Sequence, residues 1–179
     1  MKFCCQCGSP VRMGIPKGDD RLRHLCEACG TVHYINPKVI VGCIPVWGEH
    51  VLLCRRAIEP RVGFWTLPAG FMEMDENLQA AACREAMEEA NVEVEIESLY
   101  NLYSLPHISQ VYVFFRARMV NEVHFPGYES LETRLFLQKD IPWDDLAFET
   151  VRRSLAYFFA DRENGEFVMR MEDVKPSGM

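Results

Sequence analysis

Hydrophobic residues gather in short runs along the chain, and the spacing within each run predicts alternating strands and helices. Val39 to Trp47 is a continuous apolar run typical of a buried strand, and Gly48-Glu49 predicts a turn into a second strand, Val51 to Arg56. Gln110 to Met119 is rich in β-branched and aromatic residues, which favour a central strand. Shorter strands are expected at Phe64 to Leu67, Val92 to Ile96, Leu99 to Leu105, Leu131 to Leu137 and Phe167 to Met171.

Two other segments show the spacing of an amphipathic helix. The first follows Asn77, which suits an N-cap, and ends at Asn91, where a left-handed C-cap residue is expected. The second runs from Phe148 to Asp161 and ends near Asn164-Gly165. Mixed strands with one helix in the middle and another near the end predict an α/β fold, an α/β/α sandwich.

The first helix carries an acidic face. Glu85, Glu88 and Glu89 stand at positions i, i+3 and i+4, so the helical period places their carboxylates together. Like charges at this spacing repel, and a hard divalent cation such as Mg²⁺ or Mn²⁺ would explain the pattern. The alternative is the solvated face of an ordinary amphipathic helix. Arg84 can pair with Glu88, and Gly70 in the preceding LPAGF loop lets backbone approach a ligand closely.

The whole run resembles the Nudix box, G-x5-E-x7-R-E-U-x-E-E-x-G-U with U aliphatic. It is filled by Gly70, Glu76, Arg84, Glu85, Ala86, Glu88, Glu89, Asn91 and Val92. Asn91 departs from the final glycine of the pattern, which affects the helix cap and leaves the acidic positions intact. The resemblance implies that the sandwich has a mixed sheet between helices. It also implies that Glu85, Glu88, Glu89 and the carbonyl near Gly70 bind Mg²⁺ or Mn²⁺, with Glu76 supporting these ligands.

The same resemblance implies a reaction. The substrate would be a nucleotide small molecule, a nucleoside diphosphate linked to another group, and the enzyme would hydrolyse its pyrophosphate. A pyrophosphate is an anion that repels water and hydroxide, so cations must neutralise it while a positioned water attacks in line. In related enzymes the base is a glutamate of the box or one on a mobile loop.

Composition and charge limit the class of protein, its compartment and its partners. The chain has 179 residues, of which 49% are hydrophobic and 25% charged, as in a globular protein with one ordinary domain and a small module. No apolar run approaches the roughly 20 residues that span a bilayer. The N-terminus lacks the apolar stretch of a signal peptide, so we expect a cytoplasmic protein with no membrane contact. The formal net charge of -7 argues against non-specific binding to nucleic acid.

Cysteines supply a second motif near the N-terminus. Cys4 and Cys7 form one CxxC pair, and Cys26 and Cys29 form another, with the spacing expected of a four-thiolate zinc site. Such a site has no open position, so its Zn²⁺ would be structural. A redox pair or unpaired buried thiols are the alternatives, and Cys5 could compete with Cys4. We therefore expect a zinc ribbon over residues 1–36 and a Nudix hydrolase domain over residues 37–179.

Several residues outside the helix are candidates for the site. Arg55 and Arg56 end a strand, and because neighbouring side chains point to opposite faces, at most one can reach a phosphate from the sheet. Arg84 is a further candidate for substrate contact. Glu129 and Glu132, in GYESLETRLF, lie where related enzymes place the loop carboxylate that acts as base. The alternative for both is a surface loop carboxylate.

Aromatic residues and subfamily resemblance bear on the substrate. Trp65, Tyr112 and Phe114 could stack on a flat ring, although strand aromatics also fill cores. NADH pyrophosphatases with a zinc ribbon carry an SQPWPFPxS sequence after the box, which is absent here, where the chain reads LYSLPHISQVYVFF. Pyrophosphatases acting on FAD or ADP-ribose resemble nearly the whole chain, including GFWTLPAGFME and PGYESLETRLF. We therefore expect hydrolysis of FAD or ADP-ribose with release of AMP.

Other functions stay open. One is an NADH or NAD⁺ pyrophosphatase, or an enzyme that removes an NAD cap from RNA. A different class is a catalytically silent Nudix nucleotide sensor or a nucleic-acid-binding regulator, for which the ribbon offers a small basic cluster at Lys17, Arg21, Arg23 and His24. Intact acidic box positions favour an enzyme, and the acidic net charge argues against a nucleic-acid reader. The resemblance also implies that the ribbon could form a homodimer.

Overall fold

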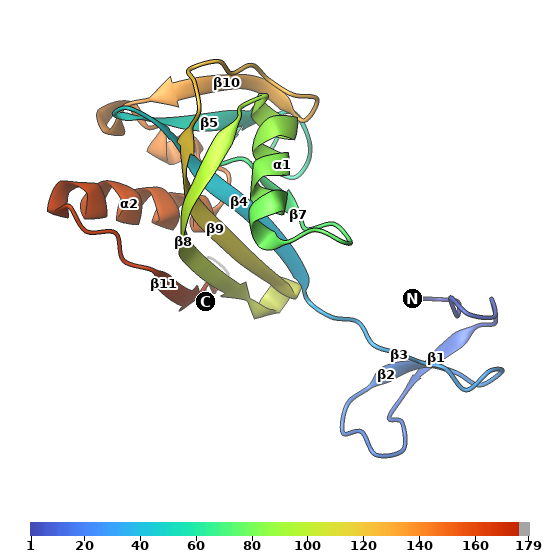
Figure 1. Ribbon diagram of the computed structural model, residues 1–179. Coiled ribbons are helices and arrows are strands. Elements are labelled where there is room, and N and C mark those ends of the chain that lie inside the picture. Colours follow the sequence, from blue (N-terminus) through green and yellow to red (C-terminus); the bar gives the residue numbers. More distant parts are fainter. Residues whose placement is uncertain (176–179) are drawn as a thin grey trace. The chain divides into compact units, whose positions relative to one another are not determined.

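The computed structural model describes residues 1–175, which form two compact units, Met1–Pro37 and the chain from Lys38 onward (Figure 1). The first unit contains a three-stranded antiparallel sheet, with β2 between its two neighbours. Its strands are β1 (Val11–Gly14), β2 (Arg23–Cys26) and β3 (Val32–His33). Each CxxC pair lies in a tight turn, closed by hydrogen bonds of 2.9 Å from Gly8 N–H to Cys4 O and from Gly30 N–H to Cys26 O.

The second unit is built on one mixed sheet of eight strands. The order is β10-β5-β4-β9-β8-β11, with β6 paired to β5 and β7 paired to β4 off this path. The β4–β9 and β8–β11 pairs are parallel, and the other pairs of these strands are antiparallel. The bounds are β4 (Lys38–Trp47), β5 (His50–Arg56), β6 (Trp65–Thr66), β7 (Ala69–Phe71), β8 (Val94–Leu105), β9 (Gln110–Met119), β10 (Ser130–Phe136) and β11 (Arg170–Asp173).

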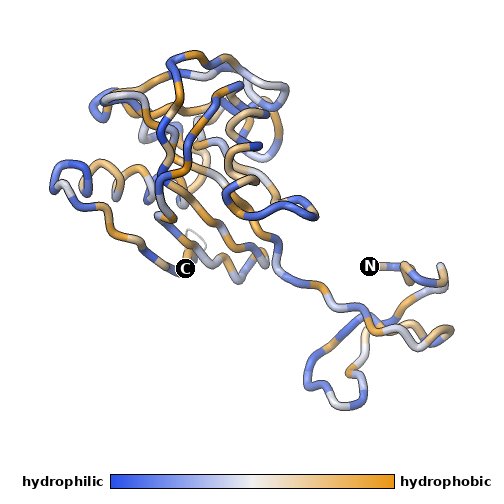
Figure 2. Tube along the Cα trace, viewed as in Figure 1, coloured by the Kyte–Doolittle hydropathy of each residue, from blue (hydrophilic) through white to orange (hydrophobic). Residues whose placement is uncertain are grey.

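Helices α1 (Leu78–Ala90) and α2 (Glu149–Asn164) cover opposite faces of this sheet. Alternate residues of each strand face opposite sides, so Leu52 of β5 packs in the core cluster of α1, whereas Leu53 packs in that of α2. The central strands are mainly hydrophobic, and hydrophilic residues gather in the loop before α1 and at the end of α2 (Figure 2). The predicted α/β/α sandwich with a mixed sheet is confirmed.

Local signals placed the first helix accurately. The Asn77 side chain accepts a hydrogen bond from the Ala80 N–H at 2.9 Å, as an N-cap does. Asn91 adopts the left-handed conformation, with φ of 47° and ψ of 38°, and its N–H donates to the carbonyl of Met87. Both predicted caps are confirmed. Short 3₁₀ helices at Pro106–Ile108, Gln138–Asp140 and Trp143–Asp145 complete the helical elements of the described chain.

The structure differs from the predicted strands in three places. The last strand, expected at Phe167 to Met171, is β11 at Arg170–Asp173. The expected strands at Val92 to Ile96 and Leu99 to Leu105 are one strand, β8, whose pairing with β9 shifts register twice near Ser98. These irregularities break the alternation of polar and apolar residues, and the sequence therefore suggested two segments. Strand β7 was not predicted, because three residues that pair with β4 leave no periodic pattern. No helix among the described residues is long and apolar enough to cross a membrane.

Candidate functional site

The second unit has a cleft of about 940 Å³. The residues that line it come from elements far apart in the sequence. Helix α1 contributes Glu85, Glu88 and Glu89, and the loop before β10 contributes Glu129. Strand β9, the N-cap residue of α2 and the first turn of that helix contribute mostly apolar lining, which we call the apolar end; it includes Tyr112, Phe114, Phe148, Thr150 and Val151. The cleft therefore combines a carboxylate-rich end with an aromatic wall.

The three helix glutamates occupy different environments. Glu85 and Glu89 are each 7% exposed, whereas the side chain of Glu88 is 58% exposed. Burial, together with the nearby charge of Glu85, raises the pKa of Glu89 to about 8. Burial also raises the pKa of Glu85 above its ordinary value. Two carboxyl groups are thus held close together in a partly dry site, where each makes ionisation of the other more costly.

One oxygen of Glu89 has no hydrogen-bond partner although it is buried: Oε2 faces no donor in the described chain. A buried polar atom without a partner is uncommon in native proteins, because its desolvation is not offset. A divalent cation would supply the missing contact and would favour the ionised forms of Glu85 and Glu89. The residues therefore fit a hard metal ion with oxygen ligands, as the acidic pattern of the sequence suggested.

The Arg84 side chain is paired with carboxylates and is therefore not free within the cleft. Its guanidinium pairs with Glu76 at 2.8 Å, with Glu85 at 2.8 Å and with Glu88 at 2.9 Å. It also donates to the carbonyl of Phe71 at 3.0 Å. Hydrogen bonds from Arg84 lower the pKa of Glu76 to about 2. Arg84 and Glu76 thus tie the segment before α1 to the helix, and substrate contact by Arg84 stays a prediction.

Gly70 lies in β7 directly against the carboxylate of Glu85. A Cβ atom at this position would lie 2.4 Å from both Glu85 oxygens, far inside van der Waals contact. With glycine the backbone of β7 and the side chain of Glu85 meet closely, and any other residue would force the carboxylate to shift. Gly70 was expected in a tight loop, but it lies in the short strand β7, and the close approach to Glu85 occurs there.

Arg56 stands between the acidic and aromatic ends. Its positive charge lowers the pKa of both Glu89 and Tyr112, against the larger effect of burial on each, so it lies near both groups. Its Nε donates to Pro60 O at 2.8 Å, and its guanidinium lies 5.1 Å from the centre of the Phe148 ring. Arg56 lines the cleft, whereas the neighbouring Arg55 does not belong to the lining. The guanidinium of Arg56 has parallel N–H donors, and in this place it suits the binding of a diphosphate.

The apolar end contains a buried hydroxyl without a partner. Thr150, in the first turn of α2, is 2% exposed, and its Oγ1 makes no hydrogen bond in the described structure. Phe148, the N-cap residue of α2, provides no side-chain cap. Tyr112 stacks on Phe114 with ring centres 6.2 Å apart and planes at 26°. Sequence analysis did not single out Thr150 or Phe148, since a threonine at the start of a helix is common and only the assembled cleft distinguishes it.

Three predicted residues lie outside the lining of the cleft. Arg55 donates to Gly63 O at 2.9 Å and lies 3.8 Å from Glu132. Glu132 also pairs with Arg134 at 3.1 Å. Trp65 is 8% exposed and packs edge-on against Phe136 in the core. The roles predicted for Arg55, Glu132 and Trp65 stay predictions, and each side chain is engaged elsewhere in this structure.

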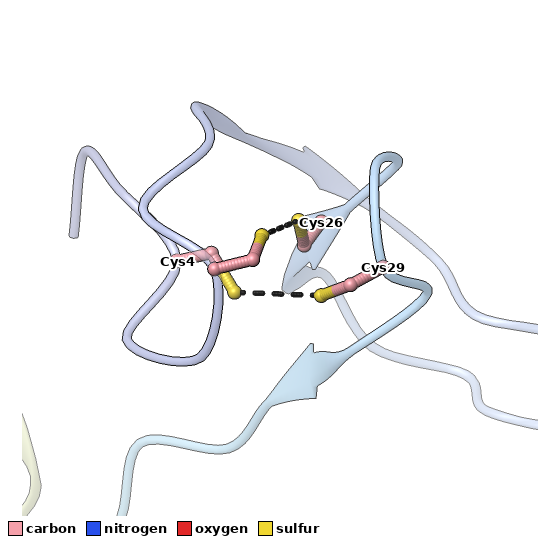
Figure 3. Close-up of side chains that lie close together, drawn as sticks. Cys4, Cys26 and Cys29 are labelled. Carbon is pink, nitrogen blue, oxygen red and sulfur yellow. Dashed lines mark hydrogen bonds between the residues drawn. The ribbon is translucent and has the colours of Figure 1, made fainter.

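The first unit holds a cluster of four thiols, from Cys4, Cys7, Cys26 and Cys29, whose sulfur atoms all lie within 4.8 Å of one another (Figure 3). The Cys4–Cys29 and Cys7–Cys26 sulfur distances are 3.7 and 3.5 Å. Four thiolates around one Zn²⁺ at about 2.3 Å have sulfur atoms about 3.8 Å apart, so the cluster fits a tetrahedral zinc site.

Two polar residues that the sequence did not single out support these thiols. His33 is 8% exposed and its Nε2 lies 3.2 Å from Cys4 Sγ, while the Thr31 hydroxyl lies 3.1 Å from Cys29 Sγ. The Thr31 contacts lower the pKa of Cys29 to about 6. Cys5 is exposed and lies outside the cluster. In the basic cluster of this unit, Arg23 forms an ion pair with Asp19 at 2.8 Å.

Comparisons with known families match both units. A zinc-ribbon family model described as Nudix N-terminal matches residues 2–35, and the model described as NUDIX domain matches residues 36–158. A crystal structure described as a NUDIX hydrolase from Nitrosomonas europaea is 53% identical, with a TM-score of 0.95, and covers 97% of this chain and 99% of that one.

Curated relatives share a different description, NAD-capped RNA hydrolase NudC. The relative from Stutzerimonas stutzeri is 27% identical over 98% of this chain and 60% of its own length. The relative from Vibrio vulnificus is 35% identical over 52% of this chain and 34% of its own length. The chain therefore spans less than two thirds of the length of these relatives.

Proposed function

The chain belongs to the NUDIX family, with a zinc ribbon before its NUDIX domain, and on this premise we propose that it hydrolyses the pyrophosphate bond of an adenine dinucleotide. The observation that carries the proposal is Glu89, whose buried Oε2 lacks a partner in a cleft that also presents Arg56 and an aromatic wall. The cleft thus offers an acidic site for cations, a cation for phosphate and a surface for a flat ring.

Glu85, Glu88, Glu89 and the backbone near Gly70 would hold the divalent cation, Mg²⁺ or Mn²⁺. When bound, such an ion neutralises phosphate charge and polarises the phosphoryl group. Arg84 keeps Glu85 and Glu88 oriented through bonds of 2.8 and 2.9 Å. Glu76 acts through Arg84, because its two oxygens fix the guanidinium in place. The four cysteines of the ribbon would hold one structural Zn²⁺.

Glu129 is the better placed of the two candidate bases. It is exposed, lines the cleft and lies near enough to Glu85 and Glu89 to raise the pKa of each. A carboxylate in this position can accept a proton from an attacking water. Glu132 is occupied by Arg55 and Arg134 outside the lining of the cleft. Arg56 would bind the diphosphate between the carboxylates and the aromatic end.

For the substrate we propose NAD(H) or an NAD-capped RNA first. This choice is supported by the description of the curated relatives, NAD-capped RNA hydrolase NudC, and by a cleft with an aromatic wall at one end. A nucleic-acid substrate is therefore part of the proposal despite the net charge of -7. Binding through the cap would not require the basic surface that reads a nucleic-acid backbone.

A second candidate is FAD or ADP-ribose, favoured by one observation in the sequence. The SQPWPFPxS sequence of NADH pyrophosphatases is absent, and β8 continues through LYSLPHISQ into β9 without it. All of these substrates share an ADP half, and they differ in the group beyond the pyrophosphate. Hydrolysis of NADH, FAD or ADP-ribose releases AMP, whereas an NAD-capped RNA releases nicotinamide mononucleotide and keeps the AMP unit as its 5′-monophosphate end.

A substrate panel with Mg²⁺ or Mn²⁺ tests the proposal. NADH, an NAD-capped RNA oligonucleotide, FAD and ADP-ribose are incubated with the zinc-loaded protein, and nucleoside monophosphate is measured by chromatography. We expect Glu88→Gln to lower kcat by about 10²-fold or more with the fold intact. Glu166→Gln, an exposed glutamate outside the cleft, is the matched control. Absence of hydrolysis of every substrate by the wild type would refute the proposed function.

A further inference from the structure

We propose that Asn91 is a positioning residue that fastens the loop of residues 121–129 to the end of helix α1. The inference rests on the proposed function, because this loop carries Glu129, the candidate base. Asn91 stands where the Nudix box has glycine. Its side chain makes a contact that glycine cannot make, since Nδ2 donates to the carbonyl of Phe125 at 3.1 Å.

The loop also caps the helix through its backbone. The carbonyl groups in the last turn of an α-helix have no partner within the helix. Here the Phe125 N–H donates to Ala90 O at 3.0 Å, and the Gly127 N–H donates to Glu89 O at 2.9 Å. Phe125 thus donates to the helix and accepts from Asn91. Glu89, one of the two buried glutamates of the helix, thus also holds the loop through its carbonyl.

Gly127 brings the loop unusually close to the helix. A Cβ atom at this position would lie 1.7 Å from the carbonyl oxygen of Glu88, so no other residue fits without a shift of the backbone. Two residues later, the carbonyl of Glu129 accepts a hydrogen bond from the Ala57 N–H at 2.8 Å. Glu129 is therefore fixed from the helix on one side and from the end of β5 on the other.

Apolar packing contributes little to this fastening. Val123, Phe125 and Tyr128 are 62%, 53% and 97% exposed. Besides the backbone bonds, His124 Nδ1 lies 2.9 Å from the Thr133 hydroxyl of β10. A segment with few buried apolar contacts opens locally unless polar contacts hold it. The Asn91 side chain adds such a contact at the point where the loop leaves the helix.

The Asn91→Gly variant tests the positioning of the loop separately from the stability of the fold. Glycine suits the left-handed C-cap better than asparagine and restores the box residue, so the melting temperature should be unchanged or higher. Loss of one hydrogen bond should speed amide exchange in residues 121–129 by roughly 3- to 10-fold. The kcat for the best dinucleotide of the panel should fall by a similar factor, roughly 3- to 10-fold, with KM unchanged. Asn91→Asp, which keeps the shape but loses the donor, should change the exchange rates and kcat in the same direction.

The control is Asn164→Asp, the same chemical change at the exposed end of α2, which should alter neither exchange nor kcat. Gly127→Ala should lower kcat further, on the order of 10²-fold, because it displaces the loop. In the double variant, the Asn91→Gly effect should largely disappear, since the contact is already broken.

The outcomes separate the two proposals. A wild type that hydrolyses no substrate of the panel refutes the proposed function, and the fastening itself then stands or falls on the exchange rates alone. An active wild type whose Asn91→Gly variant exchanges its loop amides at the wild-type rate overturns the inference. Faster exchange with unchanged kcat overturns it as well, because the contact would then hold the loop without positioning a catalytic group.

Discussion

Replacing Glu89 by glutamine should change how the stability of the metal-free protein depends on pH. Glu89 is 7% exposed, and burial raises its pKa from an ordinary value of 4.5 to about 8 in the folded state. Between these two values the unfolded chain has released a proton that the folded chain still binds. The free energy of unfolding therefore falls as pH rises through this window, and the loss levels off above the folded pKa.

The magnitude follows from the two pKa values. Each pH unit inside the window changes the free energy of unfolding by about 1.4 kcal/mol, and the slope halves near the folded pKa. Between about pH 6 and pH 8 the contribution of Glu89 should fall by about 2 kcal/mol. Glutamine has the same shape and does not titrate, so this part of the pH dependence should be missing from Glu89→Gln.

Urea unfolding at pH 6, 7 and 8 measures this difference, with zinc left in place and no Mg²⁺ added. The wild type and the variant share their other titrating groups, so the difference between their unfolding free energies isolates Glu89. A difference that stays constant within about 0.5 kcal/mol over this range would refute the reasoning. Added Mg²⁺ should stabilise the wild type at pH 8 by mass action and should stabilise Glu89→Gln much less.

Three further predictions concern other parts of the molecule. Thr150→Val replaces a buried hydroxyl that has no partner, so urea unfolding should show equal or higher stability. In this variant KM for the dinucleotide should rise roughly 3- to 10-fold, whereas Thr150→Ser should keep the wild-type KM. Glu76→Gln removes the charged partner of Arg84, and we expect lower stability and a higher Mg²⁺ concentration for half-maximal rate. An unchanged Mg²⁺ requirement would exclude a supporting role. Metal analysis should find one zinc per chain, and Cys26→Ser should abolish it; full zinc content in that variant would contradict the four-thiol site.

The local features of the site could be predicted from the sequence. Helical spacing placed Glu85, Glu88 and Glu89 on one face, and both Asn77 and Asn91 cap the helix as expected. The spacing of the cysteines likewise indicated the thiol cluster. These features depend on contacts between residues close in the chain, or on a motif whose spacing reflects a tight turn. Short-range geometry is the same in nearly every fold, so the sequence alone suffices.

The tertiary structure decided which of these groups meet and how they are charged. The three glutamates look equivalent in the sequence, yet only Glu89 is both deeply buried and left with an oxygen without a partner. Adjacent arginines were indistinguishable until the sheet placed Arg56, and not Arg55, in the lining of the cleft. The burial of a side chain and its hydrogen-bond partners depend on segments far apart in the chain, which no local pattern specifies.

Asn91 at the helix cap shows most clearly what the sequence determined and what the tertiary structure decided. From the sequence, Asn91 was a departure from the box that the left-handed conformation tolerates, and its φ of 47° confirms this. Only the folded chain brings Phe125 within 3.1 Å of its side chain. The sequence by itself determined the backbone conformation, because that depends on one residue and its neighbours. The contact depends on where a loop more than thirty residues away crosses the helix end, and packing of the whole sheet decides that position.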